Sequence, residues 1–73
     1  MFSIWLEKRI KKNSIAIYNI ANDLHMAPRT VYRHLNGEGL PTFSYVVAYC
    51  WYFNRYFGYK DDPIDIWYEC VCV

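Results

Sequence analysis

The chain has 73 residues, a formal net charge of +1, and a composition that is 55% hydrophobic and 21% aromatic. This length fits one small domain, and the high apolar fraction excludes a disordered chain. Apart from Ser44, residues 43–53 form the longest apolar run. That run is about half of the roughly 20 residues that a membrane span needs, so we expect no membrane segment.

The charge is divided unevenly along the chain. Residues 1–60 contain all eight Lys and Arg residues against three acids, a balance of +5. Residues 61–73 contain four acids and no base, a balance of −4. We therefore expect a basic domain over residues 1–60 and an acidic, aromatic tail over residues 61–73 that is kept away from the basic working face.

Two helices are predicted in the first third of the chain. The apolar spacing after Ser3 indicates a helix over residues 3–12 with Ser3 as its N-cap. Asn13 is a plausible left-handed stop for this helix. Ser14 is then expected to cap a second helix over residues 15–24, whose apolar residues again follow the i, i+3, i+4, i+7 rule.

A three-residue turn, His25–Ala27, separates the second helix from the third. Pro28 suits the first position of that third helix, because its missing N–H has no partner there in any case. The helix is expected to end near Leu35, before a loop that contains two glycines. Thr42 then caps a fourth helix over residues 43–55.

The fourth helix is so apolar that its inward side has to be chosen by spacing. We expect the buried stripe to consist of Phe43, Val46, Val47, Cys50 and Phe53. Asp62-Pro63 is typical of a further helix start. The last residues, 68–73, fit a helix and an extended strand equally well, because aromatic and β-branched residues alternate there. The predicted fold is a compact all-α bundle of four or five helices, with a tail that is helix or strand.

A series of residues at fixed spacing runs through the second, third and fourth predicted helices. The series comprises Ile20-Ala21, Leu24, Met26, Val31, Asn36-Gly37, Pro41-Thr42 and Val46-Val47. With these residues, the segment 15–54 resembles the lambda-repressor/Cro (XRE) helix-turn-helix family. The resemblance covers a little over half of the chain and implies a DNA-binding domain whose third helix enters the major groove.

Three positions depart from the family's pattern. Ile17 stands where the family often has a glutamine that braces the recognition helix. Pro28 occupies the first base-reading position and offers no hydrogen bond to a base. His25 occupies a turn position that is usually glycine, although histidine tolerates a positive φ better than a branched residue does.

The resemblance implies a set of DNA contacts. Base edges would be read by the third helix, and phosphates would be held by the residue after it and by the start of the second helix. The charge of the first helix's end adds two lysines, since a phosphate contact needs only charge and reach. The expected DNA-binding residues are Arg29, Thr30, Tyr32, Arg33, Asn36, Asn19, Tyr18, Lys11 and Lys12.

The aromatic residues of the C-terminal half exceed what a small core should need. Because aromatic side chains dominate interface cores, we expect a homodimer surface there. The residues assigned to it are Trp51, Tyr52, Tyr56, Trp67, Tyr68 and Val71.

The function expected from these features is that of a small sequence-specific transcriptional repressor of phage or mobile-element type, acting as a dimer on palindromic double-stranded DNA. One alternative is a protein-binding module, such as an antitoxin, an antirepressor or an inhibitor of host defence. Another is an architectural DNA binder with little sequence preference.

Catalytic, cofactor and metal sites are not expected. No carboxylate pair, cysteine–histidine pair or phosphate-binding glycine loop has a convincing context. The three cysteines have no finger-like partners and no export signal precedes them, so we expect reduced thiols, no metal and a cytoplasmic location. No small-molecule ligand is expected either, because no second domain is present to sense one.

Overall fold

The computed structural model describes residues 1–72, and all of its regular elements are helices. They are α1 (Phe2–Lys12), α2 (Ile17–Asp23), α3 (Pro28–Asn36), α4 (Phe43–Phe57), α5 (Pro63–Ile66) and the π-helical segment η1 (Trp67–Val71), which continues α5. The all-α prediction is confirmed. Of the two alternatives for the tail, the structure has the helical one as far as Val71, and residue 73 lies outside the described part.

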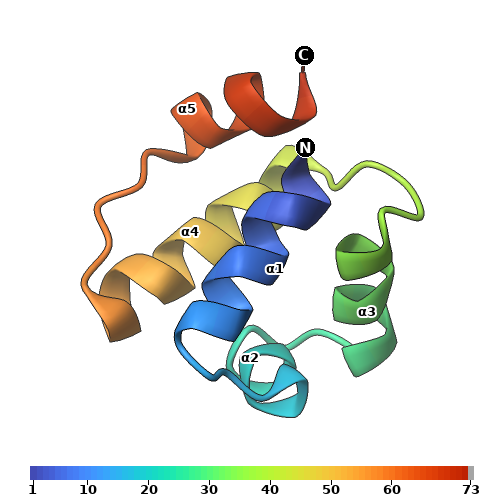
Figure 1. The fold of residues 1–73 in the computed structure, drawn as a ribbon, viewed down its shortest axis with the longest axis vertical. Coiled ribbons are helices and arrows are strands. Elements are labelled where there is room, and N and C mark those ends of the chain that lie inside the picture. Colours follow the sequence, from blue (N-terminus) through green and yellow to red (C-terminus); the bar gives the residue numbers. More distant parts are fainter. Residues whose placement is uncertain (73) are drawn as a thin grey trace.

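The helices form a compact body of 29 × 27 × 21 Å around a central pair (Figure 1). α1 lies across α4, α3 packs beside α1, and α2 closes the end of the bundle next to α3. The segment α5–η1 crosses above α4 and the beginning of α1, so the two termini lie near each other. α3 therefore stands at one side of the molecule, while α5–η1 covers another.

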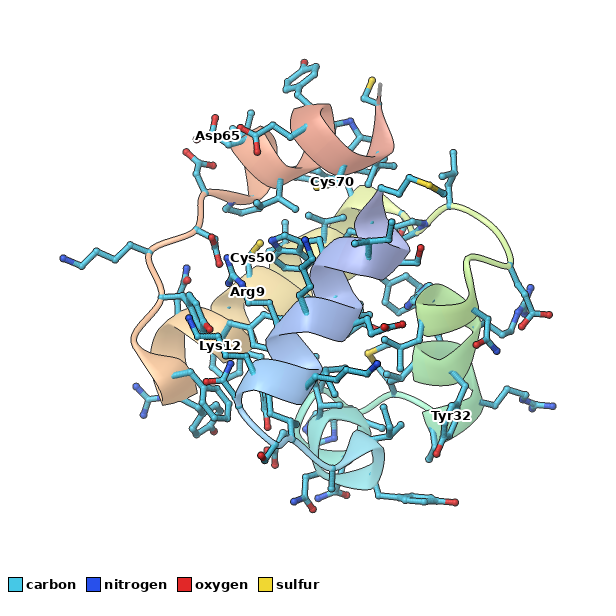
Figure 2. All side chains as sticks on the ribbon, in the orientation of Figure 1. Arg9, Lys12, Tyr32, Cys50, Asp65 and Cys70 are labelled. Carbon is cyan, nitrogen blue, oxygen red and sulfur yellow. The ribbon has the colours of Figure 1, made fainter. Side chains whose placement is uncertain are left out.

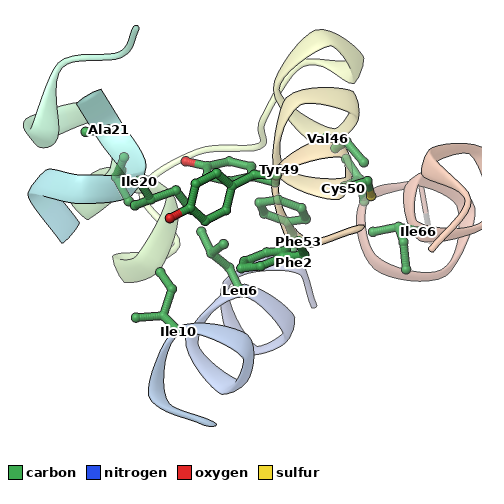
Figure 3. Packing of buried hydrophobic residues seen from close by; sticks show 13 residues of the cluster. Phe2, Leu6, Ile10, Ile20, Ala21, Val46, Tyr49, Cys50, Phe53 and Ile66 are labelled. Atoms are coloured by element: carbon green, nitrogen blue, oxygen red, sulfur yellow. The ribbon is translucent and has the colours of Figure 1, made fainter. Parts of the chain in front are cut away.

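The core lies between α1, α4 and the helices that flank them. Leu6 of α1, Ile20 of α2, Val31 of α3 and Val46 of α4 are completely buried. Figure 3 shows the α1 side chains converging with those of α4 on one cluster. α5 and η1 contribute Ile66 and Val71 to the same cluster, so the acidic tail is part of the folded body.

The predicted caps at Ser3 and Ser14 are wrong. α1 begins at Phe2 without a side-chain cap, and α2 begins at Ile17 after Ala16. Ser14 itself takes the left-handed conformation that was expected at Asn13, with a φ of 52°. The N–H groups of Ser14 and Ile15 bond to carbonyls of α1, at Lys11 and Ile10, so Ser14 closes the first helix in a Schellman motif and cannot cap the second.

The inward side of α4 also differs from the predicted stripe. Its buried residues are Val46, Tyr49, Cys50, Tyr52 and Phe53. Phe43 and Val47, which were expected inside, are 41% and 38% exposed. The physical reason is that α3 offers a polar partner to Tyr49, which lets a tyrosine occupy the core without an unsatisfied hydroxyl.

The segment between α4 and α5 is fastened to α1 by Arg9. Both carboxylate oxygens of Asp61 accept hydrogen bonds from the Arg9 guanidinium, which also lies 3.8 Å from the ring centroid of Tyr59. Asn54 adds two hydrogen bonds with the backbone of Asp61, both 2.9 Å long. Asp62 then caps α5 as predicted, because its Oδ1 accepts the N–H of Ile64 at 2.9 Å.

Candidate nucleic-acid interface

α2, the turn after it and α3 form a tightly packed helix–turn–helix unit. The turn contains His25 at a φ of 55°, a left-handed conformation that histidine tolerates better than a branched residue does. The N–H of His25 bonds to the carbonyl of Asn22 at 3.2 Å, and that of Met26 bonds to the carbonyl of Ala21 at 2.8 Å. These two bonds end α2 and fix the direction in which α3 leaves the turn.

α3 is strongly two-sided. Val31 and His34, three residues apart, face the core, and Val31 is completely buried. The opposite side is exposed and polar. It carries Arg29, Tyr32, Arg33 and Asn36. Figure 2 shows Tyr32 pointing away from the body of the molecule at the outer side of α3.

The exposed arginines of α3 have no acidic partner in the described chain. Within residues 1–72 the ion pairs join Arg9 to Asp61 and Lys11 to Glu7, and neither Arg29 nor Arg33 takes part in one. Gly37, at a φ of 71°, ends the helix in the left-handed conformation just beyond Asn36. The polar side of α3 is thus exposed and cationic.

A buried hydrogen bond anchors this helix to the core. His34 Nδ1 and the hydroxyl of Tyr49 are 2.7 Å apart, and the His34 ring also lies edge-on to Tyr45 at a centroid distance of 4.8 Å. Burial lowers the pKa of His34 below its usual value, and the positive charge of Arg33 lowers it further. Burial also raises the pKa of Tyr49. Both groups are therefore neutral near pH 7, as a buried hydrogen-bonded pair requires.

This anchor was not predicted from the sequence, where His34 was not among the residues assigned to the core. The available signal was its position three residues after Val31, which puts the two on the same side of a helix. Its partner had no such signal, since spacing in α4 favoured the wrong side for Tyr49.

The predicted phosphate contacts on α2 lie close to the start of α3. Tyr18 is 69% exposed and Asn19 is exposed. Together with Asn22, Met26 and Pro28 they line one shallow hollow. Thr30, on α3, is only half-buried. The structure thus places the predicted α2 residues beside Pro28, the first residue of α3, and none of the predicted α3 residues lines this hollow.

The two lysines of α1 that were predicted to contact DNA differ in their surroundings. Lys11 is exposed and its Nζ lies 3.0 Å from Glu7 Oε1. Lys12 ends α1 on the side of the molecule away from Tyr32 (Figure 2). The structure therefore does not bring Lys12 to the exposed side of α3.

The six residues predicted for a dimer surface separate into two groups. Trp51, Tyr56 and Tyr68 are between 49% and 64% exposed. The others belong to the fold of the single chain, with Tyr52 and Val71 in its core and Trp67 packed edge-on against Phe43.

Residues 1–72 contain no group of three metal-ligating side chains placed to share an ion. None of their helices has the length and apolar character that crossing a membrane requires. The three cysteines are unpaired thiols, and burial raises the pKa of Cys50 to about 12, which leaves that thiol protonated and unreactive.

Comparisons with protein-family models, with curated proteins and with solved structures found no match for this chain. Evidence for the function therefore comes from the geometry of α2, the turn and α3.

Proposed function

We propose that this protein binds double-stranded DNA in a sequence-dependent way and represses transcription by covering a promoter. The observation that carries the proposal is the outer side of α3, where two arginines and a tyrosine are exposed without acidic partners beside Asn36, whose Nδ2 donates to Glu38 Oε2 at 3.4 Å. A helix of this kind fits the major groove, which is about 12 Å wide.

The roles of the side chains follow from their chemistry and their places. Arg29 and Arg33 are one helical turn apart, so both face the groove, and a guanidinium can pair with O6 and N7 of guanine. Tyr18 and Asn19 on α2 would hold a phosphate beside the start of α3. Asn36 would hold a second phosphate at the other end of α3, where Gly37 turns the chain away.

A repressor of this size would act as a dimer. Two copies would place their α3 helices in successive major grooves about 34 Å apart on a palindromic site. The resemblance of residues 15–54 to the lambda-repressor/Cro family supports this arrangement, and a phage or mobile element is the setting in which such short repressors are expected.

Selection of binding sites from random duplex DNA tests the proposal. Rounds of enrichment from a random duplex library should yield a palindromic consensus, and Arg33→Ala should bind that consensus about 5- to 150-fold more weakly, the range for one bidentate base contact. Arg55→Ala is the matched control, because Arg55 is an exposed cation on α4, outside the recognition surface. Equal affinity for the consensus and for random DNA would reject base reading.

A protein-binding function is the second candidate, and the outer side of α5–η1 favours it. Ile64 and Tyr68 are 54% and 64% exposed there, next to Asp65 and Glu69. An apolar patch rimmed by one sign of charge is typical of a protein contact. Absence of enrichment in the DNA selection, with binding of a host protein that Tyr68→Ala abolishes, would favour this candidate.

A further inference from the structure

The outer side of α4 has an uncharged, exposed stretch from Ser44 to Trp51, and the exposed Arg55 follows one turn later on the same side. From Phe43 to Asn54 the sequence contains no charged residue. Val47 and Trp51 are 38% and 49% exposed on this side, and Ser44 is exposed between them and the start of the helix. Exposed apolar residues that form a contiguous patch typically mark an interaction surface, whereas single exposed apolar residues do not.

Large and small side chains alternate along this face. Residues 44, 47, 48 and 51 are three and four positions apart and so form one strip, here called the α4 strip. Ser44 and Ala48 are small and one turn apart, which leaves a shallow notch, whereas Trp51 projects one turn further on. If a second α4 runs antiparallel across the strip, Trp51 of each copy covers Ser44 of the other, and Val47 meets Ala48.

We propose that the α4 strip is the homodimer interface of this protein, with the two α4 helices antiparallel about a twofold axis between residues 47 and 48. A twofold axis requires a self-complementary patch, and large-on-small pairing at 44 and 51 satisfies that condition. The inference deepens the proposed function, on which it rests for the use of a dimer on DNA.

Charge favours a second copy on this face over the other exposed patch. Copies that met through α5–η1 would bring Asp62, Asp65 and Glu69 of both chains together without a base. Like charges at such a contact cost several kcal/mol. Residues 44–51 of the α4 strip carry no charge, and the Arg55 residues of two antiparallel copies would lie at opposite ends of the contact, so this face does not have the repulsion.

The available area predicts a weak dimer. Phe43, Trp51 and Tyr56 are each about half exposed, and the rings of Trp51 and Tyr56 are in contact at a centroid distance of 6.0 Å. With roughly 100 Å² from each aromatic residue, the strip and its margins provide on the order of 500 Å² per copy. That places the dimer at the low end of specific interfaces, where dissociation at micromolar concentration is expected.

The strip also lies away from the recognition surface. α4 meets α3 through Tyr45 and Tyr49, which contact His34. On a helix, positions 44, 47 and 51 lie on other sides than 45 and 49. A dimer through the α4 strip therefore leaves Arg29 and Arg33 uncovered in both copies.

Sedimentation equilibrium of the full chain tests the proposal at concentrations from about 1 to about 200 µM. The wild-type protein should change from monomer to dimer in this range, and Ser44→Glu should weaken the dimer at least about tenfold because it puts an unpaired charge beneath Trp51 of the partner. Tyr68→Ala removes an equally exposed aromatic residue outside the strip and should leave the dimer unchanged. A wild-type protein that stays monomeric, or a Ser44→Glu protein that dimerises normally, overturns the proposal.

Mixing two variants tests the register. Ser44→Glu and Trp51→Lys should each be monomeric, whereas their mixture should form a heterodimer, because residue 44 of one copy faces residue 51 of the other. A mixture that stays monomeric, while circular dichroism shows both variants folded, overturns the antiparallel arrangement.

Failure of this inference can be distinguished from failure of DNA binding. Ser44→Glu should lower the affinity for a palindrome but not for a single half-site, whereas Arg33→Ala should lower both and leave the dimer intact. If the wild-type protein dimerises through the α4 strip but binds no DNA, the proposed interface is supported and the proposed function is rejected.

Discussion

Arg9 joins three parts of the chain through one guanidinium group. It lies over the rings of Trp5, Phe53 and Tyr59 at centroid distances of 5.0, 5.8 and 3.8 Å, and it forms a bidentate ion pair with Asp61. The hydrogen bonds to Asp61 raise the pKa of Arg9 above its usual value. Because both partners are largely shielded from water, this pair is expected to contribute more than an ordinary surface salt bridge.

Arg9→Ala should lower the free energy of unfolding by about 2–3 kcal/mol, since it removes the ring contacts and leaves the Asp61 carboxylate without its partner. Arg9→Lys keeps the charge but loses the planar fork and the stacking, so we expect a loss of about 1–2 kcal/mol. Urea unfolding followed by tryptophan fluorescence measures both. Arg55→Ala, at an exposed cation of α4, should change stability by less than about 0.5 kcal/mol; an equal loss in all three variants would show that the contacts of Arg9 carry no special weight.

His34 makes the stability of the fold depend on pH. Its native pKa lies below the usual 6.5, so between those two values the unfolded chain binds more protons than the folded one. Stability should therefore be complete above about pH 6.5 and should decline as the pH falls below that value. Unfolding measured at pH 7.5, 6.5 and 5.5 should show this decline in the wild type and in His25→Asn, and it should be largely absent in His34→Gln. A decline that persists in His34→Gln would assign the effect to other groups.

Elements were predictable from the sequence where local chemistry decides them. The proline at the start of α3 and the Asp62-Pro63 start of α5 each act within one turn of the chain, and the structure has a helix boundary at both. α4 was predictable as a helix but not in its orientation, because almost every position is apolar and spacing alone does not choose a side. Its orientation depends on His34 and Asp61, which approach from α3 and from the segment before α5.

The predicted DNA-binding residues show the same difference between what local sequence decides and what helix packing decides. The outward positions of α3 are determined by the 3.6-residue period, and four of its five predicted DNA-binding residues are exposed, whereas Thr30 is half-buried. The places of Lys12 and Arg9 depend on how α1 crosses the other helices, which no local pattern encodes. Ser14 was assigned to the wrong helix because serine favours the N-cap position and seldom takes the left-handed conformation that it has here.

The helix caps provide a prediction at the level of single elements. Asp62 accepts a hydrogen bond from the N–H of Ile64, whereas Thr42 occupies the same position before α4 without such a bond. Asp62→Ala should therefore cost about 1 kcal/mol, and Thr42→Ala should cost only a few tenths. Thermal unfolding by circular dichroism measures the difference, and a larger loss in Thr42→Ala than in Asp62→Ala would contradict the cap assignment.

The molecule as a whole is electrically polar. The exposed arginines of α3 lie at one side, and the acidic residues of α5 and η1 lie at another, as the separate positions of Tyr32 and Asp65 in Figure 2 illustrate. The body is at most 29 Å across, which is similar to the Debye length of about 30 Å at 0.01 M salt. At low ionic strength, DNA should therefore be repelled by one side of the protein while the other side attracts it.

Removing negative charge from α5 and η1 should weaken the repulsion of DNA by that side of the protein. The double variant Asp65→Asn/Glu69→Gln should bind random duplex DNA about 2- to 5-fold more tightly than the wild type at about 0.01 M salt, because a long-range repulsion is removed. At about 0.2 M salt the Debye length falls below 10 Å, and the two proteins should bind random DNA almost equally. Fluorescence anisotropy with a labelled duplex measures both conditions, and unfolding curves of the two proteins exclude a change in the fold. A gain that is the same at both salt concentrations would mean that Asp65 and Glu69 lie against the DNA itself, which is incompatible with recognition through α3.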